Sequence, residues 1–193
     1  MGKFNRFTTL SVILIGLTLT GDSSALAEFI IEEATQYFDV GGDIPSEILA
    51  EISAHRGGNI VALTKTNHEM RYSVESIGDR CKVIDTVINT QIIYLVPRWT
   101  EYQTARPEMK KAWDRFFRAI IVHENGHGDL AKAASRDLSR SIGQAKGHCS
   151  AIKTLVAGRR NIVVSRYELK NQAYDKRTMH GQKQGIVFPE VLE

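Results

Sequence analysis

The sequence lacks long basic runs, low-complexity segments and internal repeats, and it has only two cysteines among 193 residues. With 42% apolar and 24% charged residues, the composition excludes a collagen-like, low-complexity or strongly disordered chain. The formal charge is only +3, and Lys and Arg are not clustered as in nucleic-acid-binding chains. We therefore expect a globular protein that has no nucleic-acid partner.

The sequence has only one apolar run near the length of a membrane span, at about residues 7–19, and it is shorter than the roughly 20 residues that a spanning helix needs. Lys3 and Arg6 precede it, and Ala25-Leu26-Ala27 fits the small-x-small pattern of a cleavage site. These features predict a signal peptide at residues 1–27 that is cleaved after Ala27. An uncleaved N-terminal anchor is the alternative. The mature chain is expected to be periplasmic or secreted, without stable membrane insertion.

The two cysteines, Cys81 and Cys149, are an even pair in a chain that is expected to be exported. In an oxidising compartment such a pair predicts one disulfide bond. The alternative is a pair of metal-binding or catalytic thiols. The spacing does not favour it, because the two residues do not form a C-x-x-C motif.

The remaining sequence predicts one α+β domain over residues 28–193. Its N-terminal half is expected to form an antiparallel sheet, and its C-terminal half two long helices. The expected strands are residues 28–38, 60–66, 69–76 and 82–95. The expected helices are residues 45–55, 107–143 and 150–174, followed by an irregular tail over residues 175–193.

One motif carries chemistry. His123-Glu124-Asn125-Gly126-His127 is an H-E-x-x-H sequence within the predicted helix 107–143. Residues i and i+4 share one helical face, so both imidazoles can bind one Zn²⁺. Glu124 between them does not bind the metal and can act as general base toward a zinc-activated water. The alternative is two buried histidines beside a Glu in a local ion pair.

A catalytic zinc site needs a third protein ligand. The metzincin motif is excluded, because no histidine stands at the required position after His127. The sequence favours His180 in the polar, glycine-containing tail. Asp175 is the second candidate, and Glu168, in the position expected for a gluzincin, is the third.

The sequence resembles a bacterial family of predicted secreted zinc-dependent proteases, formerly a domain of unknown function, over nearly the whole mature chain. The resemblance implies zinc binding by His123 and His127, Glu124 as the catalytic carboxylate, and a zincin-like active-site helix. It also implies that the His180-Gly181 segment belongs to the site. The matching features are Tyr37, Val40-Gly41, Cys81, Leu95-Val96-Pro97-Arg98-Trp99, Trp113, the H-E-x-G-H motif, Cys149, Tyr174-Asp175, Thr178, His180-Gly181 and Gln184-Gly185.

The leading functional hypothesis is a secreted zinc metalloprotease that acts on a peptide or protein substrate, with metal ligands His123, His127 and His180. One alternative is a zinc amidase or deacetylase that acts on cell-envelope material. Another is a non-catalytic binding module with a zincin-like fold. The sequence leaves the substrate, the regulation and the oligomeric state open.

Overall fold

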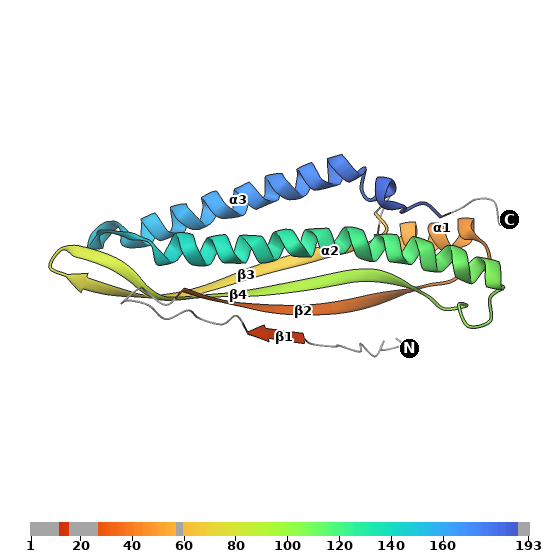
Figure 1. Cartoon of the computed structure of the whole chain (residues 1–193), viewed down its shortest axis with the longest axis horizontal. Helices are drawn as coiled ribbons and strands as arrows, with labels where there is room; N and C mark the ends of the chain where they lie inside the picture. Colours follow the sequence, from red (N-terminus) through yellow and green to blue (C-terminus); the bar gives the residue numbers. More distant parts are fainter. Residues whose placement is uncertain (1–11, 16–26, 57–59, 189–193) are drawn as a thin grey trace.

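The computed structural model describes residues 12–15, 27–56 and 60–188. It is a mixed α+β fold of elongated shape, with a sheet on one side and long helices on the other (Figure 1). The predicted fold class is therefore confirmed. Of the predicted signal peptide, only residues 12–15 and Ala27 are among the described residues, so signal cleavage stays a prediction.

The described residues form a sheet of five strands, in the order β1-β2-β4-β3, and β5 also pairs with β4. The long strand β4 lies in the centre, between β2 and β3. Every second residue along most of β4 is buried, as expected for a strand with one face against the helices. The strands are β1 (Val12–Ile15), β2 (Ala27–Val40), β3 (Leu63–Ile77), β4 (Arg80–Trp99) and β5 (Lys146–His148).

The sheet is mixed, so the prediction of a purely antiparallel sheet is wrong. β2 and β4 are parallel, whereas β1, β3 and β5 are each antiparallel to their partners. The chain passes from β2 through a helix to β3, and the β3–β4 hairpin then returns β4 between β2 and β3. The expected strands 60–66 and 69–76 are one strand, with an irregularity in pairing between Arg71 and Ser73.

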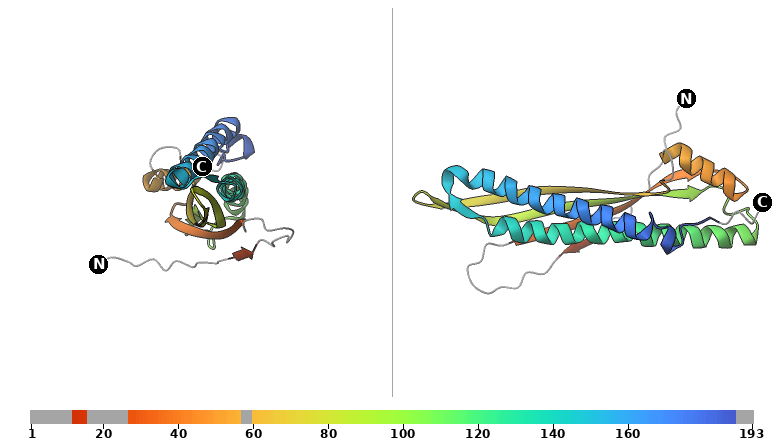
Figure 2. Two further views of the ribbon diagram at one scale, coloured as in Figure 1. Left: turned by 90° about the vertical axis from the view of Figure 1, so that its left-hand side faces the viewer. Right: turned by 90° about the horizontal axis from the view of Figure 1, so that it is seen from above.

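The helices form the second layer. α2 packs on β4, and α3 packs on α2 along the side away from the sheet (Figures 1 and 2). The short α1 lies at the opposite end of the molecule from the β3–β4 hairpin. The helices are α1 (Pro45–Arg56), α2 (Pro107–Gly143) and α3 (Ile152–Thr178), with 3-10 turns η1 (Cys149–Ala151) and η2 (Gln182–Gln184).

The long helix α2 begins and ends where the sequence predicts. Pro107 occupies its first turn, where the missing N–H costs nothing. Its apolar face is buried at intervals of three and four residues, from Met109 through Phe116 and Ile120 to Leu138 and Ile142. This face runs along most of the sheet (Figure 1), and the H-E-x-x-H motif lies near the middle of α2.

The second long helix extends further than predicted. α3 continues to Thr178, so Asp175 lies in its last turn and not in an irregular tail. Lys176 and Arg177 in the same turn favour this extension, because cations stabilise a helix C-terminus. Beyond α3, the chain returns toward the core, where the Phe188 ring stacks on that of Phe116 with the ring centroids 4.9 Å apart.

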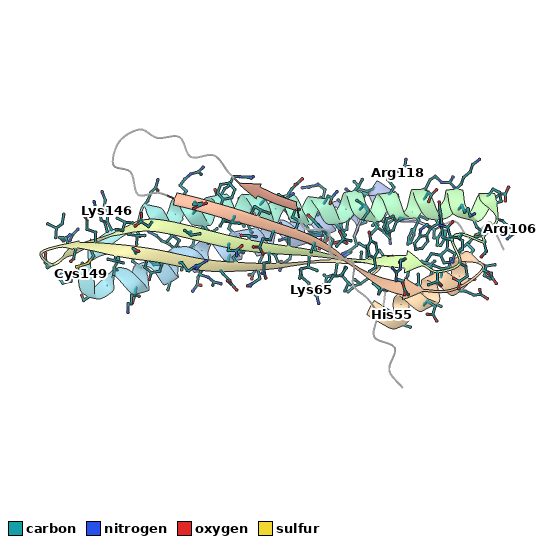
Figure 3. The ribbon with its side chains drawn as sticks, turned by 90° about the horizontal axis from the view of Figure 1, so that it is seen from below. His55, Lys65, Arg106, Arg118, Lys146 and Cys149 are labelled. Atoms are coloured by element: carbon teal, nitrogen blue, oxygen red, sulfur yellow. A yellow bond between two sulfur atoms is a disulfide. The ribbon has the colours of Figure 1, made fainter. Side chains whose placement is uncertain are left out.

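Among the described residues, no helix is long and apolar enough to cross a membrane. The predicted disulfide is present between Cys81 and Cys149. It joins β4 to the start of η1, at the end of the molecule that carries the β3–β4 hairpin, far from His55 and Arg106 (Figure 3). The bond fits an oxidising compartment such as the periplasm or the cell exterior.

Removal of this bond is expected to lower the free energy of unfolding by about 4 kcal/mol, because the bond closes a loop with a sequence separation of 68. The measurement is urea denaturation of the protein with Cys81→Ala and Cys149→Ala together. Reductant should produce the same loss in the wild type and none in the double variant. A loss below about 1 kcal/mol would show that the bond contributes little.

His68 is expected to make stability depend on pH. Burial lowers the pKa of its imidazole, and the charge of Arg160 lowers it further. Its Nδ1 lies 2.8 Å from the hydroxyl oxygen of Thr90, whose single proton is donated to the hydroxyl of Ser135. The folded state therefore binds a proton less readily than the unfolded chain, so the free energy of unfolding falls as pH drops below about 6.5.

The test is denaturant unfolding of the wild type and of His68→Gln between pH 7.5 and 5. Gln has no charge to gain, so the wild type should lose stability more steeply than the variant as pH falls. Equal slopes would show that the protonation of His68 is not linked to folding.

Candidate metal centre

The motif residues lie on the side of α2 that faces a cleft. His123 and Glu124 are buried, and His127 is mostly buried. The two imidazole rings are perpendicular, with their centroids 4.9 Å apart. The i, i+4 spacing on α2 thus brings the two rings together, as the sequence predicts.

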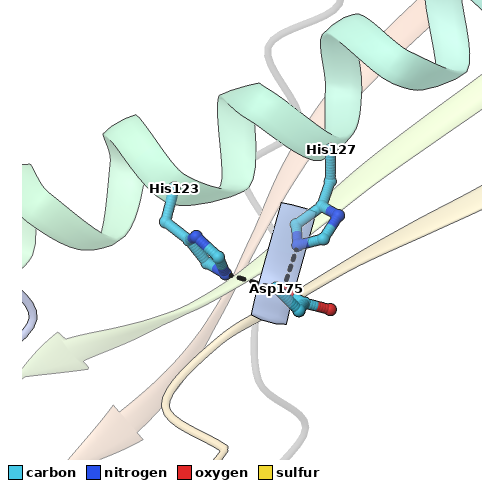
Figure 4. Close-up of side chains that lie close together, drawn as sticks. All are labelled: His123, His127 and Asp175. Atoms are coloured by element: carbon cyan, nitrogen blue, oxygen red, sulfur yellow. Dashed lines mark hydrogen bonds and ion pairs between the residues drawn. The ribbon is translucent and has the colours of Figure 1, made fainter. Parts of the chain in front are cut away.

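A third side chain reaches the same point from α3. Asp175 Oδ1 lies 3.2 Å from Nε2 of His123 and 3.0 Å from Nε2 of His127 (Figure 4). One ligand atom from each of these three residues lies within 4.8 Å of the others. No other group of three His, Cys, Asp or Glu side chains among the described residues is placed to hold a metal ion.

A hydrogen bond fixes the tautomer of His127. Its Nδ1 lies 2.8 Å from Oδ1 of Asn171, and Nδ2 of Asn171 donates to the carbonyl oxygen of Tyr167 at 3.1 Å. Because the amide nitrogen is already used, its oxygen faces the ring and must accept the proton of Nδ1. In the neutral ring, Nε2 is left with a free lone pair.

His123 is held in the same way. Its Nδ1 lies 2.9 Å from Oε1 of Gln184 in η2, and Nε2 of Gln184 donates to the hydroxyl of Tyr174 at 3.0 Å. The amide oxygen of Gln184 therefore accepts from Nδ1, and in the neutral ring Nε2 of His123 carries the lone pair. Metal-bound histidines are commonly oriented by such an acceptor on the other ring nitrogen.

The donor set therefore fits a divalent cation. Two imidazole lone pairs and a carboxylate oxygen converge, and three acceptors at this separation repel each other unless a cation or a proton lies between them. Two His and one carboxylate are a donor set used by catalytic zinc. The same set also suits Fe²⁺, whereas the H-E-x-x-H spacing on a helix favours zinc.

The ring of Tyr174 packs against both imidazole rings. It stacks on His123 with the ring centroids 5.1 Å apart and meets His127 edge-on at 5.0 Å. Its hydroxyl donates to the carbonyl oxygen of His123 at 3.2 Å, across the position of Gly126. A Cβ at Gly126 would overlap this hydroxyl. The glycine of the motif is thus explained by the close approach of α3 to α2.

Glu124 is oriented by the edge strand of the sheet. The hydroxyl of Thr64 in β3 lies 2.6 Å from Oε2 of Glu124 and 3.1 Å from the backbone carbonyl oxygen of the same residue. The carboxylate lines the same cleft as His123 and His127. Glu124 therefore lies beside the candidate metal ligands, with one oxygen held by Thr64.

The structure separates the three candidates for the third ligand. His180 is 79% exposed, and its Nδ1 lies 3.8 Å from Oδ1 of Asp175. Glu168 is exposed on α3 and is not part of the group. The geometry therefore favours Asp175, which the sequence placed second, over His180. The backbone turns sharply at Met179 and His180, where both φ angles are about +50°.

Comparison with known protein families shows to which family the chain belongs. The model of a bacterial protein family of unknown function, DUF922, matches residues 35–181. The chain belongs to the DUF922 family. No curated protein and no solved structure matches the chain. The description of DUF922 names no activity, so zinc binding and hydrolysis rest on the site itself.

The DUF922 match contains the three converging residues together with Asn171, but it ends before Gln184. The sequence did not predict the hydrogen bonds of Asn171, Gln184 and Thr64 to the motif residues. One signal could have found Asn171: it precedes Asp175 by four residues, so the two share a helical face once α3 is extended. Nothing local marks Thr64, and Gln184 is marked only as one of the features that match the family, because each meets the site through long-range packing.

A cleft of about 1180 Å³ runs over these residues in the DUF922 chain. Its walls come from α1, from residues 60–66, from α2 and α3, and from residues 180–188. A smaller cavity of about 210 Å³ between α2 and α3 contains none of the motif residues. The large cleft is therefore where a substrate would meet the candidate metal centre.

Proposed function

We propose that this protein is an exported zinc-dependent metallopeptidase whose metal is held by His123, His127 and Asp175. The observation that carries the proposal is the convergence of both Nε2 atoms on Oδ1 of Asp175, with an amide oxygen within hydrogen-bond distance of each Nδ1. A structural zinc site would be expected to have four protein ligands. Within the part of the chain that the structure describes, three residues converge, which suits an open, catalytic type of site.

The metal and Glu124 have separate roles. Zinc in such a site supplies a Lewis acid and lowers the pKa of a water molecule to about 7. Glu124 takes a proton from the attacking water as the oxygen of this water bonds to the peptide carbonyl carbon. Glu124 then passes the proton to the nitrogen as the C–N bond breaks. Thr64 holds the carboxylate in place for both transfers.

Hydrolysis assays test the proposal. The protein is incubated with a fluorescently labelled unfolded protein, and in parallel with peptidoglycan fragments. Cleavage of the unfolded protein that stops with a zinc chelator and returns with added Zn²⁺ is expected. Cleavage of peptidoglycan fragments alone would replace the peptidase by an envelope amidase. Cleavage of neither substrate with Zn²⁺ bound would contradict a hydrolase of either kind.

A further inference from the structure

The cleft beside the candidate metal centre is apolar at one end and polar at the other. Toward the N-terminal end of α2, its floor is made of buried apolar side chains from three segments: Ile52 of α1, Phe116 of α2 and Phe188 of the C-terminal segment. Ile60 (49% exposed) and Val187 (64% exposed) also line the cleft, although both are large apolar residues. Exposed apolar side chains that gather around one pocket indicate a binding surface.

This apolar end lies close to the metal-binding residues. Phe116 precedes His123 by seven residues on α2, which corresponds to about 10 Å along the helix axis. In the other direction the lining is polar, with Thr66 and Asn171 beyond His127. A ligand that crosses the metal-binding residues would therefore meet apolar groups on one side only.

The neighbouring strand offers backbone groups. Among the described strands, β3 pairs only with β4 and forms the edge of the sheet. The segment from Ile60 to Thr64, which leads into β3, lines the cleft. An unpaired strand edge can add an extended peptide through main-chain hydrogen bonds. This feature favours a polypeptide over a sugar or an acyl chain as the occupant of the cleft.

We infer that the cleft binds an extended polypeptide with a bulky apolar side chain seated against Phe116, Ile52 and Phe188, beside the scissile bond. The inference rests on the proposed peptidase function, for which it specifies the substrate class. The apolar end excludes water around the side chain, and β3 aligns the backbone. A hydrophilic envelope glycan has no group that matches the apolar end.

The test measures binding, not turnover. Fluorescein-labelled unstructured peptides that differ only in a central Leu or Ser are titrated into the full chain carrying Glu124→Gln, and fluorescence anisotropy is recorded. The Leu peptide is expected to bind about 10-fold more tightly, as burial of an apolar side chain requires. Ile60→Ser and Val187→Ser should each reduce this preference several-fold. Leu169→Ser, an equally exposed apolar residue on α3 outside the cleft, should leave it unchanged.

The outcomes separate this inference from the proposed function. Equal affinities for the Leu and Ser peptides, or an equal effect of Leu169→Ser, would overturn the apolar subsite even if the wild type hydrolyses peptides. A Leu preference that is lost with Ile60→Ser, in a protein that cleaves no peptide, would keep the subsite and reject the peptidase. Tight binding of an N-acyl glycine in place of the Leu peptide would overturn the polypeptide as occupant.

Discussion

Glu124→Gln is expected to lower kcat for peptide hydrolysis by about 1,000-fold, with the metal content unchanged. Gln has nearly the same shape, and it can still accept the hydrogen bond that Thr64 now gives to Glu124. It cannot take up and release a proton at neutral pH. The loss should therefore appear in kcat, and KM should change little. The measurement is steady-state hydrolysis of a peptide, with zinc per chain determined by elemental analysis on the same samples.

Glu168→Gln is the matched control, because it makes the same chemical change at an exposed position on α3. It should retain wild-type kcat. If Glu124→Gln lost its zinc together with its activity, the carboxylate would be holding the metal site and not moving protons. If Glu124→Gln kept full activity, the proposed general base would be wrong.

Asp175→Ala is expected to weaken zinc binding by at least about 100-fold. Loss of a residue that only orients a metal ligand already costs 10- to 100-fold, and Asp175 lies against both Nε2 atoms. His180→Ala should bind zinc within a few-fold of the wild type, because its ring is largely exposed. Competition with a chromophoric zinc chelator measures both affinities.

The zinc affinities of Asp175→Asn and His123→Ala are measured in the same competition experiment. Asn keeps the size of the side chain but loses the charge, so it separates metal binding from packing. Circular dichroism and thermal unfolding show whether each variant is folded. Loss of zinc with His180→Ala and not with Asp175→Ala would return the third ligand to the residue that the sequence favoured.

The sequence predicts the parts of the structure that local patterns determine. The spacing of apolar residues and Pro107 define α2, and the H-E-x-x-H motif places two imidazoles on one face. An even pair of cysteines predicts the disulfide. In each case, a short stretch or a simple count contains the information, and no knowledge of distant packing is needed.

The rest of the site depends on how α3 lies on α2. Asp175 reaches His123 and His127 only because α3 continues to Thr178 and packs closely over Gly126. The parallel pairing of β2 with β4 is similarly non-local, because alternation within a strand does not specify its neighbour. His180 is adjacent to a glycine in a polar segment. The sequence alone does not show whether a histidine in such a segment is a metal ligand.

The most direct test of the metal centre is anomalous diffraction at the zinc absorption edge from crystals of the protein grown with Zn²⁺. The account predicts one strong peak, about 2.0–2.2 Å from Nε2 of His123, from Nε2 of His127 and from a carboxylate oxygen of Asp175. A peak bound elsewhere, or no peak between these three residues at saturating Zn²⁺, would contradict it.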